Sequence, residues 1–167
     1  MNAKTIRPVR FDGPGCYITL TRGLEAVVDE TDAALVGQYN WCAHPAVGGL
    51  VYARTEWRAD GKRTRVTMHR LLIAPDPGYV VDHIDGNGLN NRRLNLRVCL
   101  HKENLRNSAS RKQNGLPKGV NPCRHRFEAR IQVDGVVHRL GTFDTPEEAA
   151  AVYREAAERL HGMFARY

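Results

Sequence analysis

The stretch from Tyr79 to Asn107 constrains the fold of this chain more than any other part of it. Its apolar run Tyr79-Val80-Val81 predicts a short buried strand that ends in two adjacent polar residues, Asp82 and His83. The next four residues, Asp85-Gly86-Asn87-Gly88, have the composition of a turn that tolerates positive φ. The chain is therefore expected to deliver a carboxylate and an imidazole side by side at the start of a loop.

A second strand and a helix are predicted after this loop. Residues Asn95 to Cys99 alternate between polar and apolar, as a half-buried strand would. The polar run from His101 to Lys112 predicts a helix that carries Asn104. The whole stretch thus predicts strand, loop, strand and helix.

These residue types suit phosphodiester hydrolysis. Asp82 and Asn104 offer hard oxygen donors, which suit Mg²⁺ because that ion commonly takes only one or two protein ligands and keeps water and substrate phosphate in the rest of its shell. His83 belongs to a residue type whose ordinary pKa of about 6.5 allows it to take a proton from water near neutral pH. A metal that polarises a phosphate, beside a base that activates water, makes a phosphodiesterase.

The pattern resembles the HNH (ββα-metal) endonucleases, in particular the homing type found in phages. That family places Asp-His at the end of the first strand, Asn on the second, and His or Asn on the helix. Here these are Asp82-His83, Asn95 and Asn104, with gaps of twelve residues and nine residues. The resemblance implies that His83 is the general base, that Asp82 and Asn104 hold the metal, and that Asn95 braces the loop by hydrogen bonding. The final Asn makes this an H-N-N variant, for which Mg²⁺ is expected and Mn²⁺ is the alternative.

Two other interpretations of the same stretch fit it less well. The residues could be scattered polar groups in a turn-rich loop, although their order and spacing favour the endonuclease. An EF-hand starting at Asp82 fails, because Ile84 stands at position 3 and Arg93 at position 12, where that loop needs a Glu.

The charge of the chain points to a polyanionic partner. The formal net charge is +7 and the pI is about 9.5. Ten basic residues and a single acidic one, Glu103, lie between Arg92 and Arg126. A solvated surface would normally mix the two signs, so double-stranded DNA is the expected partner.

The four cysteines form no Cys-x-x-Cys pair, so neither a structural zinc nor a disulfide framework is expected. No signal peptide and no membrane-spanning run are recognised, which favours the cytoplasm of a bacterial or phage-infected cell. We expect no small-molecule cofactor, and we favour a monomer.

The segment before the central stretch reads as a small β-rich support. Residues 1–15 are expected to form a loosely held arm. Strands are predicted at 16–20, 25–28, 41, 50–57 and 63–67, with short helices near 29–37 and at 68–73. This segment, residues 16–74, resembles the one that precedes the HNH unit in many phage enzymes, and would supply core for a motif too small to fold alone. His69 is expected to be a packed, hydrogen-bonded histidine, with a place near the metal as the alternative.

The pattern changes after a polar linker. We predict an HNH nuclease domain over residues 1–110, with its ββα-metal motif at 79–112, then a linker at 111–117 and a second domain at 118–167. Residues 127–133 alternate strictly, and Asp134-Gly135 turns the chain into a further strand that ends at Phe143. Thr145, Pro146 and Glu148 form a helix start with a capping box. The helix stripe comprises Ala149, Val152, Tyr153, Ala156 and Leu160, and Gly162 ends the helix.

This C-terminal part resembles the AP2/ERF DNA-binding domain. The resemblance is carried by the sequences KGV (118–120), ARI (129–131) and LGTFDTPEEAA (140–150), and by Tyr153 with Ala156-Ala157. It implies a three-stranded sheet that lies in the DNA major groove, where Arg and Gln can contact bases and phosphates. The tryptophans of that family are Phe127 and Arg139 here, so the base preference does not transfer. A small domain that uses its sheet for a protein partner is the alternative.

The sequence therefore predicts an α+β fold with a β-rich segment, a ββα-metal module, and a three-stranded antiparallel sheet packed on one helix. The predicted function is a metal-dependent HNH endonuclease, of homing or nicking type. A non-catalytic DNA-binding regulator is the alternative, and an RNA-binding or RNA-cleaving protein is a third. The predicted DNA contacts are Arg92, Arg93, Arg97, Arg106, Arg111, Lys112, Lys118, Arg124, Arg126, Arg130, Gln132 and Arg139.

Overall fold

The computed structural model describes residues 6–13, 15–59, 61–107, 115–165 and 167. The chain divides into two compact units, Met1–Leu100 and His101–Tyr167. The linker was predicted at 111–117, and residues 111–114 of it lie outside the described part. The domain boundaries stay a prediction.

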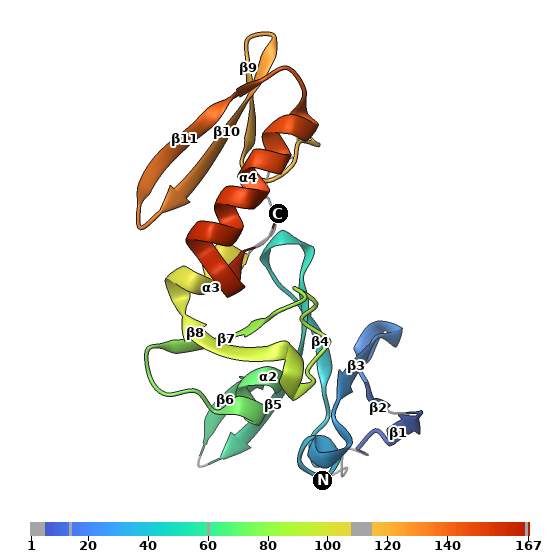
Figure 1. Ribbon diagram of the computed structural model, residues 1–167. Coiled ribbons are helices and arrows are strands. Elements are labelled where there is room, and N and C mark those ends of the chain that lie inside the picture. Colours follow the sequence, from blue (N-terminus) through green and yellow to red (C-terminus); the bar gives the residue numbers. More distant parts are fainter. Residues whose placement is uncertain (1–5, 14, 60, 108–114, 166) are drawn as a thin grey trace. The chain divides into compact units, whose positions relative to one another are not determined.

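The first unit is built from small antiparallel sheets with short helices between them (Figure 1). Two sheets have three strands and one has two. Their orders are β1-β2-β3, β4-β5-β6 and β7-β8, and every pairing is antiparallel. The bounds are β1 (Val9–Asp12), β2 (Gly15–Thr19), β3 (Glu25–Val28), α1 (Ala33–Val36), β4 (Cys42–Pro45), β5 (Val51–Ala59), β6 (Lys62–Thr67), α2 (Met68–Ile73), β7 (Tyr79–His83) and β8 (Leu96–Leu100).

One hydrophobic core joins the N-terminal segment to β7 and β8. Buried side chains from β2 and β3 pack together with Trp41, Met68 and Leu72, and with Val81 and Leu96 of the two-stranded sheet. The Trp41 indole Nε1 donates a hydrogen bond of 2.8 Å to the Val36 carbonyl, which satisfies its polar atom in the core. A two-stranded sheet is marginal by itself, so this shared core supplies the apolar contacts that β7 and β8 need.

The second unit consists of α3 (His101–Asn107), β9 (Val120–Cys123), β10 (Arg126–Val133), β11 (Val136–Phe143) and α4 (Pro146–His161). The strands form an antiparallel sheet in the order β11-β10-β9, and α4 lies along it (Figure 1). Apolar side chains of β10, including Ile131, pack on Tyr153 and Ala157 of the helix. Gly119 allows this packing, because it has φ +79° and a Cβ there would lie 1.9 Å from the Tyr153 ring.

The helix start predicted at Thr145 is present in full. The Thr145 hydroxyl accepts a hydrogen bond from the Glu148 amide, and the Glu148 carboxylate accepts one from the Thr145 amide. Gly162 ends the helix, as predicted. The buried stripe differs at its end, where His161 is buried and Leu160 is 38% exposed.

Several predicted segments differ from the structure. Trp41 was predicted as a strand, but it directly precedes β4. Residues Val9–Asp12, predicted within a loose arm, form the edge strand β1. The strand predicted from Asn95 begins at Leu96 instead, because Asn95 ends a 3₁₀ turn, and Val98 is 48% exposed on that strand. The helix predicted over 101–112 is described only as α3, since residues 108–114 lie outside the described part.

No helix among the described residues is long and apolar enough to cross a membrane.

Candidate active site

Strand β7 presents Asp82 and His83 as consecutive residues, so their side chains point to opposite faces of the sheet. Asp82 lies opposite Arg97 of β8, and His83 lies opposite Leu96. The two residues are only 6% and 5% exposed. Both predicted reactive groups are therefore withdrawn from bulk water.

The Asp82 carboxylate forms a buried ion pair with Arg97. Its Oδ2 accepts hydrogen bonds from Arg97 Nε at 2.9 Å and from Nη2 at 2.6 Å. The Arg97 side chain is only 13% exposed. Charge-assisted bonds of this kind fix both side chains. Arg97 was predicted to contact DNA, and in the structure its charge neutralises that of Asp82.

The loop after His83 is built from asparagine and aspartate turns. The Gly86 amide donates to the His83 carbonyl at 2.9 Å, with Gly86 at φ 72°. The Asn87 amide donates to Asp85 Oδ1 at 2.7 Å, and the Leu89 amide donates to Asn87 Oδ1 at 3.1 Å. These side chains replace the backbone partners that the loop lacks.

Asn95 connects the two ends of this loop. Its Oδ1 accepts from the Asp85 amide at 3.0 Å, and its Nδ2 donates to Asp85 Oδ1 at 2.9 Å and to the Asn90 carbonyl at 2.8 Å. Its own carbonyl accepts from the Ile84 amide at 2.9 Å. Asn95 thus touches the residues that directly follow His83.

The same network sets the charge of Asp85. Partial burial by itself would raise the pKa of this carboxyl. The Asn87 backbone amide and the Asn90 and Asn95 side chains donate to it, and together they lower its pKa below the ordinary range. Asp85 consequently stays ionised at neutral pH, close to His83.

His83 stands in an aromatic cluster with two other rings. The His69 ring is 4.9 Å away at 89°, and the Tyr52 ring is 5.7 Å away at 33°. Burial lowers the pKa of His83, and its Asn91 hydrogen bond and the charges of Asp85 and Asp82 offset this effect in part. The imidazole is therefore neutral at neutral pH, which a proton acceptor requires.

His69 is packed and hydrogen-bonded, as expected, and it also lies against His83. Its Nε2 is 2.9 Å from the Thr67 hydroxyl, and its ring meets Tyr52 at 5.3 Å. Burial, with the nearby His83 and Arg70, lowers its pKa to about 3. His69 is accordingly uncharged at neutral pH, and its ring packs against the predicted base.

Asn91 is a site residue that the sequence did not reveal. It is fully buried, and its Oδ1 is 3.4 Å from His83 Nε2. The run Leu89-Asn90-Asn91-Arg92 has no periodicity that would separate a buried asparagine from an exposed one. The identification depends on the fold of the loop.

The N-terminal segment holds this loop in place. The Asn91 amide donates to the Val27 carbonyl at 2.7 Å, and the Val27 amide donates to the Leu89 carbonyl at 2.9 Å. Arg93 binds Asp32 through Nε and Nη2 at 2.9 and 2.7 Å, and its amide donates to Asp29 at 2.8 Å. Arg93 was predicted to contact DNA, and the structure gives it this anchoring contact.

The remaining predicted residues belong to the second unit, except Arg92, which is half-buried in the first. Asn104 lies on α3 and is half-buried. Buried Glu128 pairs with both Arg130 and Arg139, which are cross-strand partners, and exposed Arg126 pairs with Asp144. The Arg106 side chain, Arg111 and Lys112 lie outside the described part.

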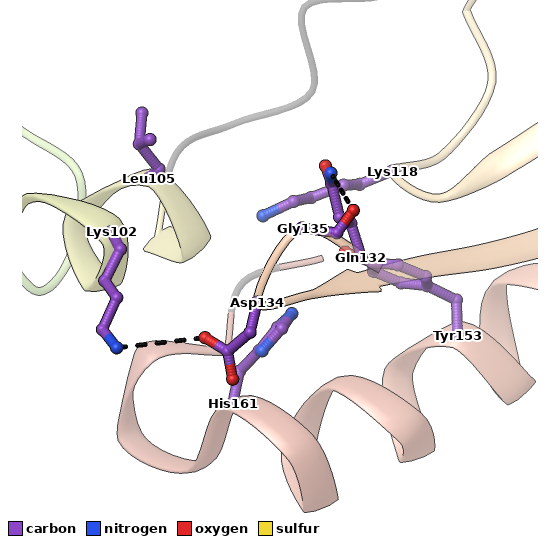
Figure 2. A pocket seen from close by; sticks show the side chains of 8 residues that line it. All are labelled: Lys102, Leu105, Lys118, Gln132, Asp134, Gly135, Tyr153 and His161. Carbon is purple, nitrogen blue, oxygen red and sulfur yellow. Dashed lines mark hydrogen bonds and ion pairs between the residues drawn. The ribbon is translucent and has the colours of Figure 1, made fainter. Parts of the chain in front are cut away.

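Several polar side chains line a pocket of about 570 Å³ in the second unit (Figure 2). It lies among α3, the turn between β10 and β11, and the end of α4. Two predicted DNA contacts, Lys118 and Gln132, line it, and Lys102 is 3.9 Å from Asp134 at its edge. Its lining residues are Lys102, Leu105, Lys118, Gln132, Asp134, Gly135, Tyr153 and His161.

The donor set suits a divalent metal held by few protein ligands. Among the described residues there is no group of three or more His, Cys, Asp and Glu side chains that could form an all-protein cage. The carboxylate of Asp82 in the first unit and the amide oxygen of Asn104 in the second are both hard donors, of the kind preferred by Mg²⁺, an ion that leaves most of its shell to water and substrate. The chemistry of these residues therefore fits Mg²⁺ or a similar ion.

Comparison with known proteins shows which family the chain is related to. The profile of the HNH endonuclease family matches residues 74–106, which include Asp82, His83, Asn95 and Asn104. Protein 3.8 of Escherichia phage T7 is 42% identical over 110 residues, which cover 63% of this chain and 89% of the phage protein.

A mimivirus protein extends the similarity. This protein of Acanthamoeba polyphaga mimivirus, named as an uncharacterized HNH endonuclease, is 36% identical over 109 residues, which cover 60% of this chain and 56% of that protein. The chain thus spans about half the length of the mimivirus protein. On the extent of the match to the phage protein, the chain belongs to the family of phage Protein 3.8, and it carries an HNH endonuclease domain.

Proposed function

We propose that this protein is a DNA endonuclease in which His83 activates the water that hydrolyses a phosphodiester bond. The observation that carries the proposal is the neutral, buried His83 at the end of β7, directly before the loop that Asn95 ties together. These residues stand inside the segment that matches the HNH family. A base that is neutral at working pH and held in one orientation is what proton abstraction from water needs.

The chemistry then follows from the residues. His83 takes a proton from a water molecule as the water oxygen bonds to phosphorus. The bond between phosphorus and the 3′ oxygen breaks, the leaving 3′ oxygen takes a proton from solvent water, and the products carry 5′-phosphate and 3′-hydroxyl ends. Asn95 keeps the loop from rotating His83 away from the phosphate, and Arg97 holds the Asp82 carboxylate in one direction.

Asp82 and Asn104 would hold the divalent metal. When bound, such an ion polarises the phosphate and stabilises the charge that develops on the leaving oxygen. Mg²⁺ is the proposed ion, because both donors are hard oxygens, and Mn²⁺ would replace it.

The second unit is proposed to bind double-stranded DNA through the sheet formed by β9, β10 and β11, as an AP2/ERF-like module. The observation in favour is the cluster of cations on that sheet, where Arg130 and Arg139 stand opposite each other, Arg124 lies in the turn before β10, and Arg126 is the first residue of that strand. Guanidinium groups bind both phosphates and the guanine edge. Binding by this unit would bring the nuclease to its site.

One ββα motif serves one strand, so we propose that the monomer nicks DNA in the manner of homing enzymes. The test is a supercoiled-plasmid assay with Mg²⁺, Mn²⁺ or EDTA on the wild type and on His83→Ala. The wild type should convert supercoiled DNA to open circle only with metal, and His83→Ala should lose cleavage while its DNA affinity stays nearly unchanged. His44→Ala is the matched control, since that histidine contacts Arg54 instead of the site, and it should cleave normally.

Other outcomes would change the proposal in defined ways. Direct conversion to linear DNA would replace the nicking monomer by a dimer or by paired nicks. Absence of cleavage on a DNA that the wild type binds would favour a non-catalytic DNA-binding regulator. Cleavage of RNA in preference to DNA would reassign the substrate.

A further inference from the structure

We infer that Asn91 is a positioning residue that selects the tautomer of His83 and leaves Nδ1 as the nitrogen that takes the proton from water. This inference rests on the proposed function of His83 as the base. Asn91 is not among the residues that the HNH resemblance assigns. Its side chain is fully buried and contacts the imidazole.

The orientation of the Asn91 amide follows from its second contact. Its nitrogen lies 3.1 Å from the Leu89 carbonyl oxygen, which can only accept. The amide NH₂ must therefore face Leu89, and the amide oxygen must face His83. A flipped amide would place Asn91 Oδ1 against the Leu89 carbonyl oxygen. Two buried acceptors without a hydrogen between them would destabilise that arrangement.

The tautomer of His83 follows from that orientation. Asn91 Oδ1 accepts and cannot donate, so His83 Nε2 must carry the hydrogen that fills the 3.4 Å contact. A neutral imidazole has one N–H and one lone pair, so the lone pair is on Nδ1. Of the two nitrogens, Nδ1 is then the one that can accept a proton.

The backbone of Asn91 is fixed from a distant part of the chain. Val27 of β3 accepts from the Asn91 amide at 2.7 Å and donates to the Leu89 carbonyl at 2.9 Å. The same Leu89 carbonyl therefore holds β3 and the Asn91 side chain together. Gly88 lets the loop approach, because a Cβ there would lie 2.5 Å from both the Tyr52 ring and the Val51 carbonyl oxygen. The N-terminal sheet thus sets the position of the acceptor that His83 meets.

Two substitutions separate this role from a purely structural one. Asn91→Leu keeps the volume and removes the acceptor, whereas Asn91→Asp keeps an acceptor for Nε2 and loses the donor to Leu89. A structural role makes the buried carboxylate at least as harmful as leucine, because it is costly to bury and meets the Leu89 carbonyl. A tautomer-selecting role makes aspartate the better of the two.

The rate experiment measures single-turnover cleavage of a bound plasmid by the full chain, well below each variant's unfolding temperature. Asn91→Leu should lower the rate constant by about 10–100-fold, as for other groups that orient a reacting side chain, with DNA affinity unchanged. Asn91→Asp should retain more activity than Asn91→Leu. Ile18→Ala, which creates a cavity in β2 of the same sheet, is the stability control and should keep the wild-type rate. Equal loss in both Asn91 variants, or a greater loss in Asn91→Asp, would overturn the inference.

A second measurement does not depend on cleavage. Long-range ¹H–¹⁵N correlation spectra of the histidine rings, with the His83 signals assigned from His83→Ala, report which nitrogen carries the hydrogen. The wild type should show His83 as the Nε2–H tautomer, and Asn91→Leu should show a mixture. A wild-type His83 protonated on Nδ1 would refute the inference even if the enzyme cleaves DNA, and the expected tautomer in a protein that fails to cleave would refute only the proposed function.

Discussion

Replacement of His69 by glutamine should make the first unit markedly less sensitive to acid. His69 is 8% exposed, and within the described part of the chain its Nδ1 has no hydrogen-bond partner. Protonation of His69 would thus place a charge and an unsatisfied N–H against the rings of Tyr52 and His83. Glutamine keeps a polar partner for Thr67 and removes the titrating group.

The size of the effect follows from the two pKa values. The pKa of His69 falls from 6.5 to about 3 on folding, so the unfolded chain binds more protons below pH 6.5. A group with a depressed folded pKa of this sign stabilises the protein fully above the unfolded value, and loses that contribution as the pH falls. At pH 5 the unfolded histidine is protonated by about thirty to one, which lowers the free energy of unfolding by about 2 kcal/mol relative to pH 8.

Urea unfolding at pH 8 and pH 5, followed by tryptophan fluorescence, measures this difference. The chain has two tryptophans, Trp41 and Trp57, and both lie in the first unit, so the signal reports the unit that contains His69. The loss of unfolding free energy between the two pH values should be about 2 kcal/mol larger in the wild type than in His69→Gln. Equal losses in the two proteins would show that His69 titrates normally, and would refute its burial as an uncharged ring beside His83.

Two further predictions concern the loop and the sheet. Gly88→Ala should lower the unfolding free energy of the first unit by about 1–3 kcal/mol and slow cleavage, because the added methyl meets the Val51 carbonyl and the Tyr52 ring; unchanged stability in the same urea experiment would contradict the close approach. Arg130→Ala should weaken DNA binding in a fluorescence anisotropy titration, by about 1–3 kcal/mol and with relaxed sequence preference if it contacts a base. Arg154→Ala is the control, since Arg154 lies on α4 with its guanidinium over the Tyr167 ring. Equal affinity in all three proteins would remove Arg130 from the interface.

Local chemistry made several elements predictable. The capping box at Thr145 and the terminal Gly162 fix the ends of α4 within a few neighbouring residues, so the pattern carries the information. The run Met68–Ile73 and the strand that presents Asp82 and His83 were predictable for the same reason. Strand β1 was not, because three of its four residues are exposed and an edge strand of this kind shows no apolar alternation.

The candidate site was predictable only in its residue types. Order and spacing singled out Asp82, His83, Asn95 and Asn104, but a charge count cannot tell whether a cation meets a phosphate or a carboxylate. Arg93 meets Asp32, which precedes it by 61 residues, and Arg97 meets Asp82 across a strand pair. Asn91 was missed because its burial arises from contacts with β3 that no local pattern encodes.

The attachment of the loop to β3 bears on how such a motif can move between proteins. The segment that carries the family signature, residues 74–106, excludes Val27, Asp29 and Asp32, and these residues hold its loop. A graft of the signature alone would carry the reactive side chains without the scaffold that aims them. A transplant that is to keep the loop in place must include a strand equivalent to β3 and a carboxylate for Arg93, so the smallest transferable unit of this HNH domain is larger than its recognisable motif.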